Sequence, residues 1–339
     1  MWLDDLWFVL YVVIIGGYVI LDGFDLGVGI LGPIVARDDR EKRVLLNSIG
    51  PVWDGNEVWL VLGGGALFAA FPLVYASLFS GFYLAMMLVL LVLILRTVAI
   101  EFRSKRESAR WRTIWDWFFS ISSLGITVLL GVALGNVIQG VPIDQDGNMD
   151  VDLVKLLNPY AIAVGVTAVV MLSLHGGIFL TLKTEHELLG RVKHLVPRLM
   201  VAFIALMTVL IVWTLLLDNE ISERYLDRIW IGVFPLLALV AALVAWRQIR
   251  QQRYLTAFFA SATMIGLLMG TVAAGMYPVL LPSSTDSAYD LTVTNASSAE
   301  ATLQVMTVIA LLGMPFVLLY TAGVYYFFRG RVVLDDESY

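Results

Sequence analysis

The sequence predicts an all-α integral membrane protein with about nine transmembrane helices, and two observations carry this prediction. Of its 339 residues, 59% are hydrophobic and 15% are charged, whereas a soluble domain carries about 25% charged residues. Nine segments also reach the roughly 20 residues that are needed to cross a hydrocarbon core. Their approximate bounds are 6–34, 51–73, 78–100, 116–138, 158–182, 199–217, 229–246, 255–281 and 302–328.

The basic residues predict how these helices are oriented. Eighteen of the 22 Lys and Arg fall in alternate connections, three (Lys155, Arg224 and Arg228) fall in the opposite connections, and Arg96 lies inside the third span. Short loops rich in Lys and Arg stay on the cytoplasmic side of a membrane. We therefore expect a periplasmic N-terminus and a cytoplasmic C-terminus.

The chain reads as one polytopic membrane domain over residues 1–339. It has no linker or low-complexity segment, and Met1 to Asp5 hold two aspartates and no basic residue, so we expect no removable signal peptide. No basic stripe is present, which argues against a nucleic-acid partner. The absence of cysteine excludes disulfides, thiolate metal sites and thiol catalysis.

Ionisable residues inside the predicted spans are the main functional signal, because each costs several kcal/mol to insert. Asp22 and Asp25 lie three residues apart in the first span, and Asp54 and Glu57 have the same spacing at the start of the second. Residues three apart share one face of a helix. Neither pair can face lipid cheaply.

In the third span Arg96 follows ten apolar residues, and Glu101 lies five positions further on. With the predicted orientation, all these groups fall in the cytoplasmic half of the membrane. Such a ladder of carboxylates is what a proton-conducting path requires. The alternative interpretation is a buried ion-pair cluster that holds the first three helices together.

The three histidines offer little metal chemistry. His175 lies inside a span and could ligate a haem or join a proton relay, but a lone buried histidine is more often hydrogen-bonded to a neighbouring helix. His186 and His194 fall in a predicted cytoplasmic loop. We therefore expect no metal site in this chain.

Three long motifs lie in the first hundred residues: LDGFDLGVG at 21–29, NSIGPVWDGNEVWL at 47–60 and GGALFAAFPLVYASLFSGFY at 64–83. They resemble subunit II of the cytochrome bd-type quinol oxidases, a bacterial inner-membrane family. Shorter pieces agree along nearly the whole chain, including GNVIQGVP at 135–142 and MYPVLLPSST at 276–285. The resemblance implies two four-helix bundles plus one peripheral helix.

The resemblance also implies the function. It suggests a haem-free subunit of a terminal quinol:oxygen oxidoreductase that reduces dioxygen to water, with no catalytic residue in this chain. Two haems b and one haem d are then expected in subunit I, the partner chain. The resemblance leaves open which quinol is oxidised, whether this chain holds a structural quinone, and whether a small single-span accessory subunit binds.

By motif match, Asp54 resembles the acid at the centre of a proton route towards haem d. Arg96 and Glu101 are expected near it, with Asp22 and Asp25 as further polar members. Trp59 resembles a tryptophan beside a dioxygen entry route. From the residues alone, a proton-coupled secondary transporter is the alternative function, and a third hypothesis gives the chain a scaffolding role only.

Overall fold

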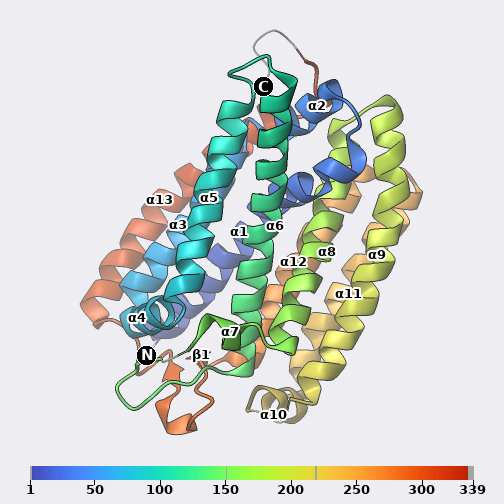
Figure 1. Ribbon diagram of the computed structural model, residues 1–339. Helices are drawn as coiled ribbons and strands as arrows, with labels where there is room; N and C mark the ends of the chain where they lie inside the picture. The colour runs from blue at the N-terminus through green and yellow to red at the C-terminus, as the bar shows by residue number, and fades with distance from the viewer. Residues whose placement is uncertain (1, 150, 218–219, 335–339) are drawn as a thin grey trace.

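The computed structural model describes residues 2–149, 151–217 and 220–334, which form a bundle of long helices (Figure 1). The longer helices are α1 (Trp2–Val35), α3 (Trp53–Ala70), α5 (Tyr83–Arg103), α6 (Ala109–Gln139), α8 (Pro159–Lys183), α9 (His186–Leu215), α11 (Val233–Arg250), α12 (Tyr254–Met276) and α13 (Glu300–Phe327). The shorter elements are α2 (Asp39–Ile49), α4 (Pro72–Gly81), α7 (Leu153–Leu156), α10 (Glu220–Asp227), η1 (Ile229–Gly232), β1 (Val279–Leu281), η2 (Ser287–Tyr289) and β2 (Leu291–Thr292).

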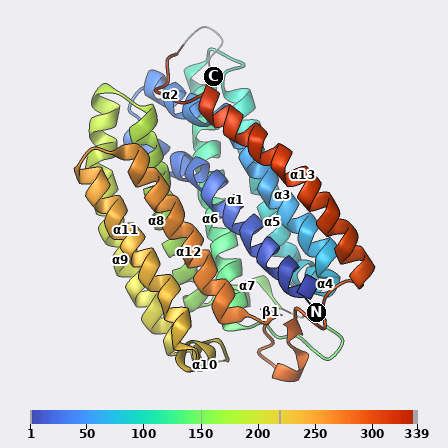
Figure 2. The same cartoon turned by 180° about the vertical axis from the view of Figure 1, so that it is seen from behind.

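In the described part of the chain, eight helices are long and apolar enough to cross a membrane. They are α1, α5, α6, α8, α9, η1 with α11, α12 and α13. The predicted class of all-α membrane protein is confirmed. The second predicted span, 51–73, corresponds to α3, which is not among the eight because Asp54, Asn56 and Glu57 lower the hydropathy of its 18 residues. It nevertheless runs alongside α1 and α13 (Figure 2).

Local sequence signals explain where the helices begin. Asp38 caps α2, because its side chain accepts a hydrogen bond from the Glu41 backbone N–H at 2.8 Å. Asn158 caps α8 in the same way and is followed by Pro159 at the first helical position. Pro72 separates α3 from α4. The third predicted span, 78–100, corresponds to α5. It begins later than predicted, at Tyr83, because residues 78–81 belong to α4.

Helix α1 lies at the centre of the molecule, packed against α3, α6, α8 and α12. Its close approach to α8 depends on glycine. A Cβ atom added to Gly27 would lie 2.0 Å from the backbone oxygen of Leu172, and one added to Gly176 would lie 2.6 Å from the backbone carbon of Gly27. Small residues at membrane helix crossings permit this kind of contact.

Helix α13 lies at the periphery, and Leu303 is its one buried side chain among the described residues. It runs from the end of the bundle with α4 and β1 to the end with α2 (Figure 2). The predicted arrangement, two four-helix bundles plus one peripheral helix, stays a prediction.

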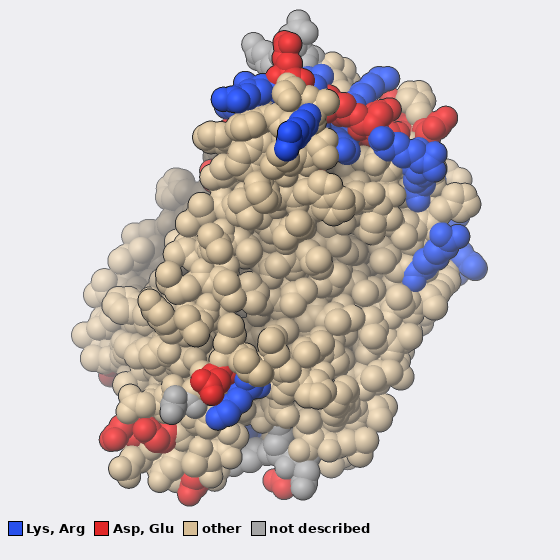
Figure 3. All heavy atoms as spheres, in the orientation of Figure 1, with Lys and Arg blue, Asp and Glu red and all other residues tan. Residues whose placement is uncertain are grey.

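Charged side chains gather towards the ends of the molecule. Figure 3 shows a wide uncharged middle zone, with most Lys and Arg at the end that carries α2. Large apolar side chains midway along the helices are exposed, for example Leu91 of α5 at 58% and Leu312 of α13 at 66%. Such a surface suits a hydrocarbon environment, and the protein is a multi-pass membrane protein.

Candidate functional site

A buried ion-pair cluster joins α1, α3 and α5. Arg96 on α5 donates from Nη2 to Asp22 Oδ1 at 2.7 Å and from Nη1 to Glu57 Oε2 at 3.4 Å. The side chains of Arg96 and Asp22 are fully buried, and that of Glu57 is 18% exposed. A lone charge in an apolar interior costs several kcal/mol. The ion pairs with Asp22 and Glu57 therefore explain how Arg96 is tolerated within a span.

A second set of contacts holds Asp25 next to this cluster. Asn56 on α3 donates from its amide to Asp25 Oδ2 at 2.7 Å and to the Leu21 backbone oxygen at 3.1 Å. Its own amide oxygen accepts a hydrogen bond from the Tyr325 hydroxyl of α13 at 2.9 Å. Asp25 is fully buried. The Asn56 amide therefore links the Asp25 carboxyl of α1 to the Tyr325 hydroxyl of α13.

Two polar atoms in this region are buried and have no hydrogen-bond partner among the described residues. They are Asp25 Oδ1 and Arg96 Nε. Buried polar groups in proteins are normally paired with protein or with ordered water. The cluster therefore has the capacity to bind water or to exchange protons.

The predicted site residues divide into two sets. The structure brings Asp22, Asp25, Glu57 and Arg96 together, so the partners that Arg96 requires are Asp22 and Glu57. Asp54, which opens α3, is exposed on the surface of the chain. Glu101, near the end of α5, is half-buried. The roles of all six residues stay predictions.

Trp59 packs between α3 and α1. Its side chain is 7% exposed, and a Cβ atom added to Gly17 would lie 2.7 Å from the Trp59 ring. The absence of a side chain at Gly17 therefore makes the space that the indole fills. The ring belongs to an apolar cluster with Ile14 and Tyr18 of α1.

An ion-pair network at the α2 end was not predicted. Arg103, which is 1% exposed, donates to Asp39 Oδ1 at 2.7 Å and to Asp116 Oδ1 at 2.5 Å. Arg112 also contacts Asp39, at 2.8 Å, and Lys42 contacts Asp116 at 3.1 Å. The network ties α2 to α5 and α6. Burial by itself would raise the pKa of Asp39, but hydrogen bonds and charges from Arg103 and Arg112 outweigh it and hold that pKa below its usual value.

His175 does not fit a haem ligand. Its Nδ1 lies 2.7 Å from Ser261 Oγ and its Nε2 lies 3.1 Å from the Ile20 backbone oxygen. The ring stacks on Phe258 with centroids 4.8 Å apart. Both nitrogens are engaged in hydrogen bonds, so neither offers a free lone pair to iron. No group of three or more His, Asp and Glu in the described chain is placed to hold a metal ion.

Three comparisons with known proteins agree. The family model described as "Cytochrome bd terminal oxidase subunit II" matches residues 3–328. The chain is 36% identical to "Cytochrome bd-I ubiquinol oxidase subunit 2" of Escherichia coli (strain K12), over 98% of this chain and 95% of that protein. It is 38% identical to "Cytochrome bd ubiquinol oxidase subunit 2" of Bacillus subtilis (strain 168), over 97% of each chain.

A solved structure shares the fold. The bd oxidase from Geobacillus thermodenitrificans contains a chain that superposes with a TM-score of 0.81 at 17% identity, covering 97% of this chain and 99% of that one. The shared fold agrees with the family match and with the 36% and 38% sequence identities, each over nearly the whole chain. The chain therefore belongs to the family of subunit II of the cytochrome bd terminal oxidases.

Proposed function

We propose that this chain is the haem-free subunit II of a quinol-oxidising, dioxygen-reducing terminal oxidase, and that it supplies scaffold and a proton path. The family implies haem cofactors in the complex and a partner, subunit I, in the bacterial inner membrane. The two haems b and the haem d are assigned to that partner. The observation that carries the proposal is the buried cluster of Asp22, Asp25, Glu57 and Arg96.

The charge balance of this cluster suits proton transfer. Three carboxyl groups (Asp22, Asp25 and Glu57) face one guanidinium, so Arg96 cannot neutralise all of them when they are ionised. Uncompensated charge in a buried site is costly. Such a cluster therefore favours holding protons that it can exchange. Glu57, which is 18% exposed, offers the contact with the outside of the chain.

Asp54 and Glu101 are proposed as the members of the path that lie nearer the surface. Asp54 lies three residues before Glu57 on α3, and its side chain is exposed in this chain. An exposed carboxylate at the start of a membrane helix is well placed to exchange protons with water or with groups of subunit I. Glu101 lies one turn beyond Arg96 towards the same end of the bundle.

The proposed orientation places this end in the cytoplasm, with the N-terminus in the periplasm. The excess of Lys and Arg at the α2 end supports it (Figure 3). Protons consumed in dioxygen reduction would then enter from the cytoplasm. Which quinol donates the electrons, whether a quinone is held structurally and whether an accessory subunit binds are not assigned.

Replacement of Asp54 by Asn tests the proton path. We expect the complex with subunit I to assemble with normal haem absorbance but to consume oxygen more slowly with quinol. Asp146→Asn is the matched control, because Asp146 is also exposed but lies in the loop after α6. Loss of haem in Asp54→Asn would favour a purely structural role. Activity in the absence of a haem-bearing partner would favour a proton-coupled transporter.

Trp59 is proposed to lie beside a route for dioxygen. Its buried indole fills an apolar gap between two helices, and an apolar gas partitions into such regions. For Trp59→Ala we expect an altered apparent KM for dioxygen and an unchanged KM for quinol, measured by oxygen consumption. Unchanged oxygen kinetics in an assembled complex would count against this role.

A further inference from the structure

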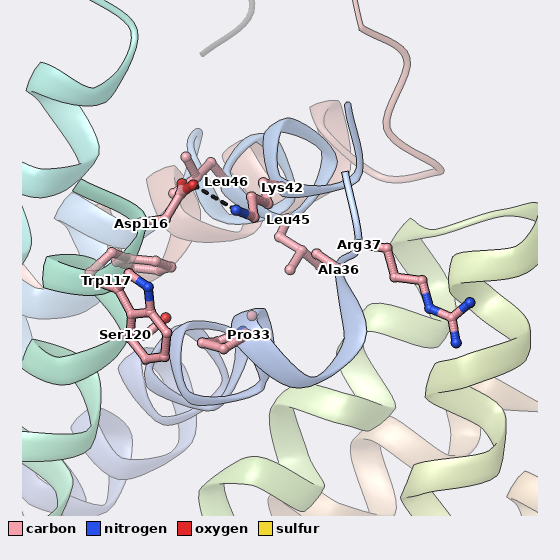
Figure 4. Close-up of a pocket in the computed structure, with 11 residues that line it drawn as sticks. Pro33, Ala36, Arg37, Lys42, Leu45, Leu46, Asp116, Trp117 and Ser120 are labelled. Atoms are coloured by element: carbon pink, nitrogen blue, oxygen red, sulfur yellow. Dashed lines mark ion pairs between the residues drawn. The ribbon is translucent and has the colours of Figure 1, made fainter. Parts of the chain in front are cut away.

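A small cavity opens between the end of α1, α2 and the start of α6, beside the ion-pair network at the α2 end and apart from the buried cluster around Arg96 (Figure 4). Its volume is about 180 Å³. Most of its lining is apolar, and its charged side chains are Arg37, Lys42 and Asp116. It is lined by Gly32, Pro33, Ala36, Arg37, Lys42, Leu45, Leu46, Asp116, Trp117, Phe119 and Ser120.

The cavity lies where the membrane-spanning part of α1 ends. Pro33 of α1 and Ala36, just after the end of α1, form one wall, and Leu45 and Leu46 from α2 lie opposite (Figure 4). Trp117, at the mouth, is 54% exposed. Tryptophan is enriched at the level of the lipid headgroups, because its ring is amphipathic. These features place the cavity at the boundary between hydrocarbon and headgroups.

The surroundings of the cavity are basic. Lys42 forms an ion pair with Asp116, and that carboxylate also receives a hydrogen bond from Arg103. Arg37 lines the cavity, and its guanidinium points away from Asp116 along the surface (Figure 4). Among the lining residues themselves, Arg37 and Lys42 are basic and Asp116 is acidic. The cations therefore exceed the carboxylates, Asp116 included.

We propose that this cavity binds an anionic phospholipid of the adjacent leaflet. The phosphate group is held by Lys42 and by Arg37 after a swing of its exposed side chain, and an acyl chain lies against Pro33, Leu46 and Trp117. The apolar lining selects a lipid over free phosphate, and the excess of cations selects an anionic headgroup over a zwitterionic one. The bound lipid bridges α1, α2 and α6.

The test uses the intact complex of this chain with subunit I in detergent, analysed by native mass spectrometry. Dioleoyl phosphatidylglycerol, dioleoyl phosphatidylcholine or inorganic phosphate is added, and the retained adducts are counted. Wild type is expected to retain phosphatidylglycerol in preference to phosphatidylcholine. Phosphate should not displace it. Retention is expected to weaken about fivefold in Lys42→Gln, the effect of one basic residue near an anionic headgroup.

Two further variants keep the test decisive. Ala36→Leu fills the cavity without changing its charge, and it should also reduce the retention of phosphatidylglycerol. The test therefore still has a readout if Lys42→Gln does not fold. Arg253→Gln removes an exposed cation in the α11–α12 connection, outside the cavity, and should retain the lipid. Equal retention in all variants, equal retention of phosphatidylcholine, or displacement by phosphate would overturn the proposal.

Discussion

Replacement of Arg96 by Met is the sharpest test of the buried cluster. The change leaves Asp22, Asp25 and Glu57 facing one another with no cation. Arg96 and Asp22 are fully buried and their atoms are 2.7 Å apart, so solvent does not screen the loss. Removing one partner of such a pair costs about 3–5 kcal/mol. We expect a marked fall in the temperature at which the complex loses its haem absorbance.

The double variant Asp22→Leu with Arg96→Met separates stability from function. Replacing both members of a buried ion pair with apolar residues of similar size is often neutral or stabilising. We expect the double variant to recover part of the stability that the single variant loses, because Glu57 still lacks its contact with Arg96. If the cluster conducts protons, oxygen consumption with quinol should remain slow although stability is partly restored.

The comparison of the two variants decides between the two interpretations of the cluster. Recovery of both heat stability and oxygen consumption in the double variant would refute the proton path and leave a purely structural ion pair. Recovery of stability without activity would support the path. The assays are haem absorbance after heating and oxygen uptake at saturating quinol, on equal amounts of assembled complex.

Three further predictions follow from particular contacts. Tyr325→Phe removes the hydrogen bond to Asn56 and should cost about 1 kcal/mol of stability and shift the pH profile of oxygen consumption, whereas the exposed Tyr320→Phe should do neither. The pKa of Asp39 is lowered in the fold, so its ion pairs stabilise the folded state fully above its unfolded pKa, about 3.9. This stabilisation is lost as the pH falls through the lower folded pKa. The stability of Asp39→Asn should therefore fall less on acidification than that of the wild type, measured by heat inactivation at graded pH. Gly27→Ala should prevent normal assembly, because its Cβ would overlap the Leu172 backbone oxygen; normal yield and haem content would contradict the close helix contact.

The sequence predicts most of the membrane fold because hydropathy and helix length are direct physical requirements of a bilayer. Helix α3 shows the limit of this reasoning. It holds Asp54, Asn56 and Glu57 in 18 residues, so hydropathy alone does not count it as a span. It is tolerated because α1, α5 and α13 supply partners for its polar side chains.

The site is predictable where the residue type carries a large insertion cost. Asp22, Asp25, Glu57 and Arg96 are conspicuous in apolar spans, and the structure brings them together. Asn56 is not predicted as a site residue although it lies in the motif NSIGPVWDGNEVWL, because a neutral amide within a span gives a weak signal. Tyr325 lies 269 residues further along the chain, and no local pattern indicates that it reaches Asn56.

Arg103 shows why charge counting predicts orientation but not contacts. In the sequence it is one of five basic residues in a predicted cytoplasmic connection, and it contributes to the bias like any solvated cation. In the structure it is 1% exposed and bridges Asp39 and Asp116. A count of charges contains no information on which of them fold back onto neighbouring helices.

The peripheral helix α13 links the cluster to the outer surface of the chain. Leu303 is its one buried side chain among the described residues. The Trp7 indole donates to Thr307 Oγ1 at 3.0 Å, and Lys183 donates to the backbone oxygen of Phe328, just after α13, at 2.6 Å. Few contacts within this chain therefore fix α13, while Tyr325 joins it to Asn56 and through it to Asp25. Because packing drives helix association in membranes, whatever packs on the exposed face of α13 also sets the position of Tyr325. The hydrogen bonding of Asp25 therefore depends on how α13 packs, because Tyr325 is the α13 residue that reaches Asn56.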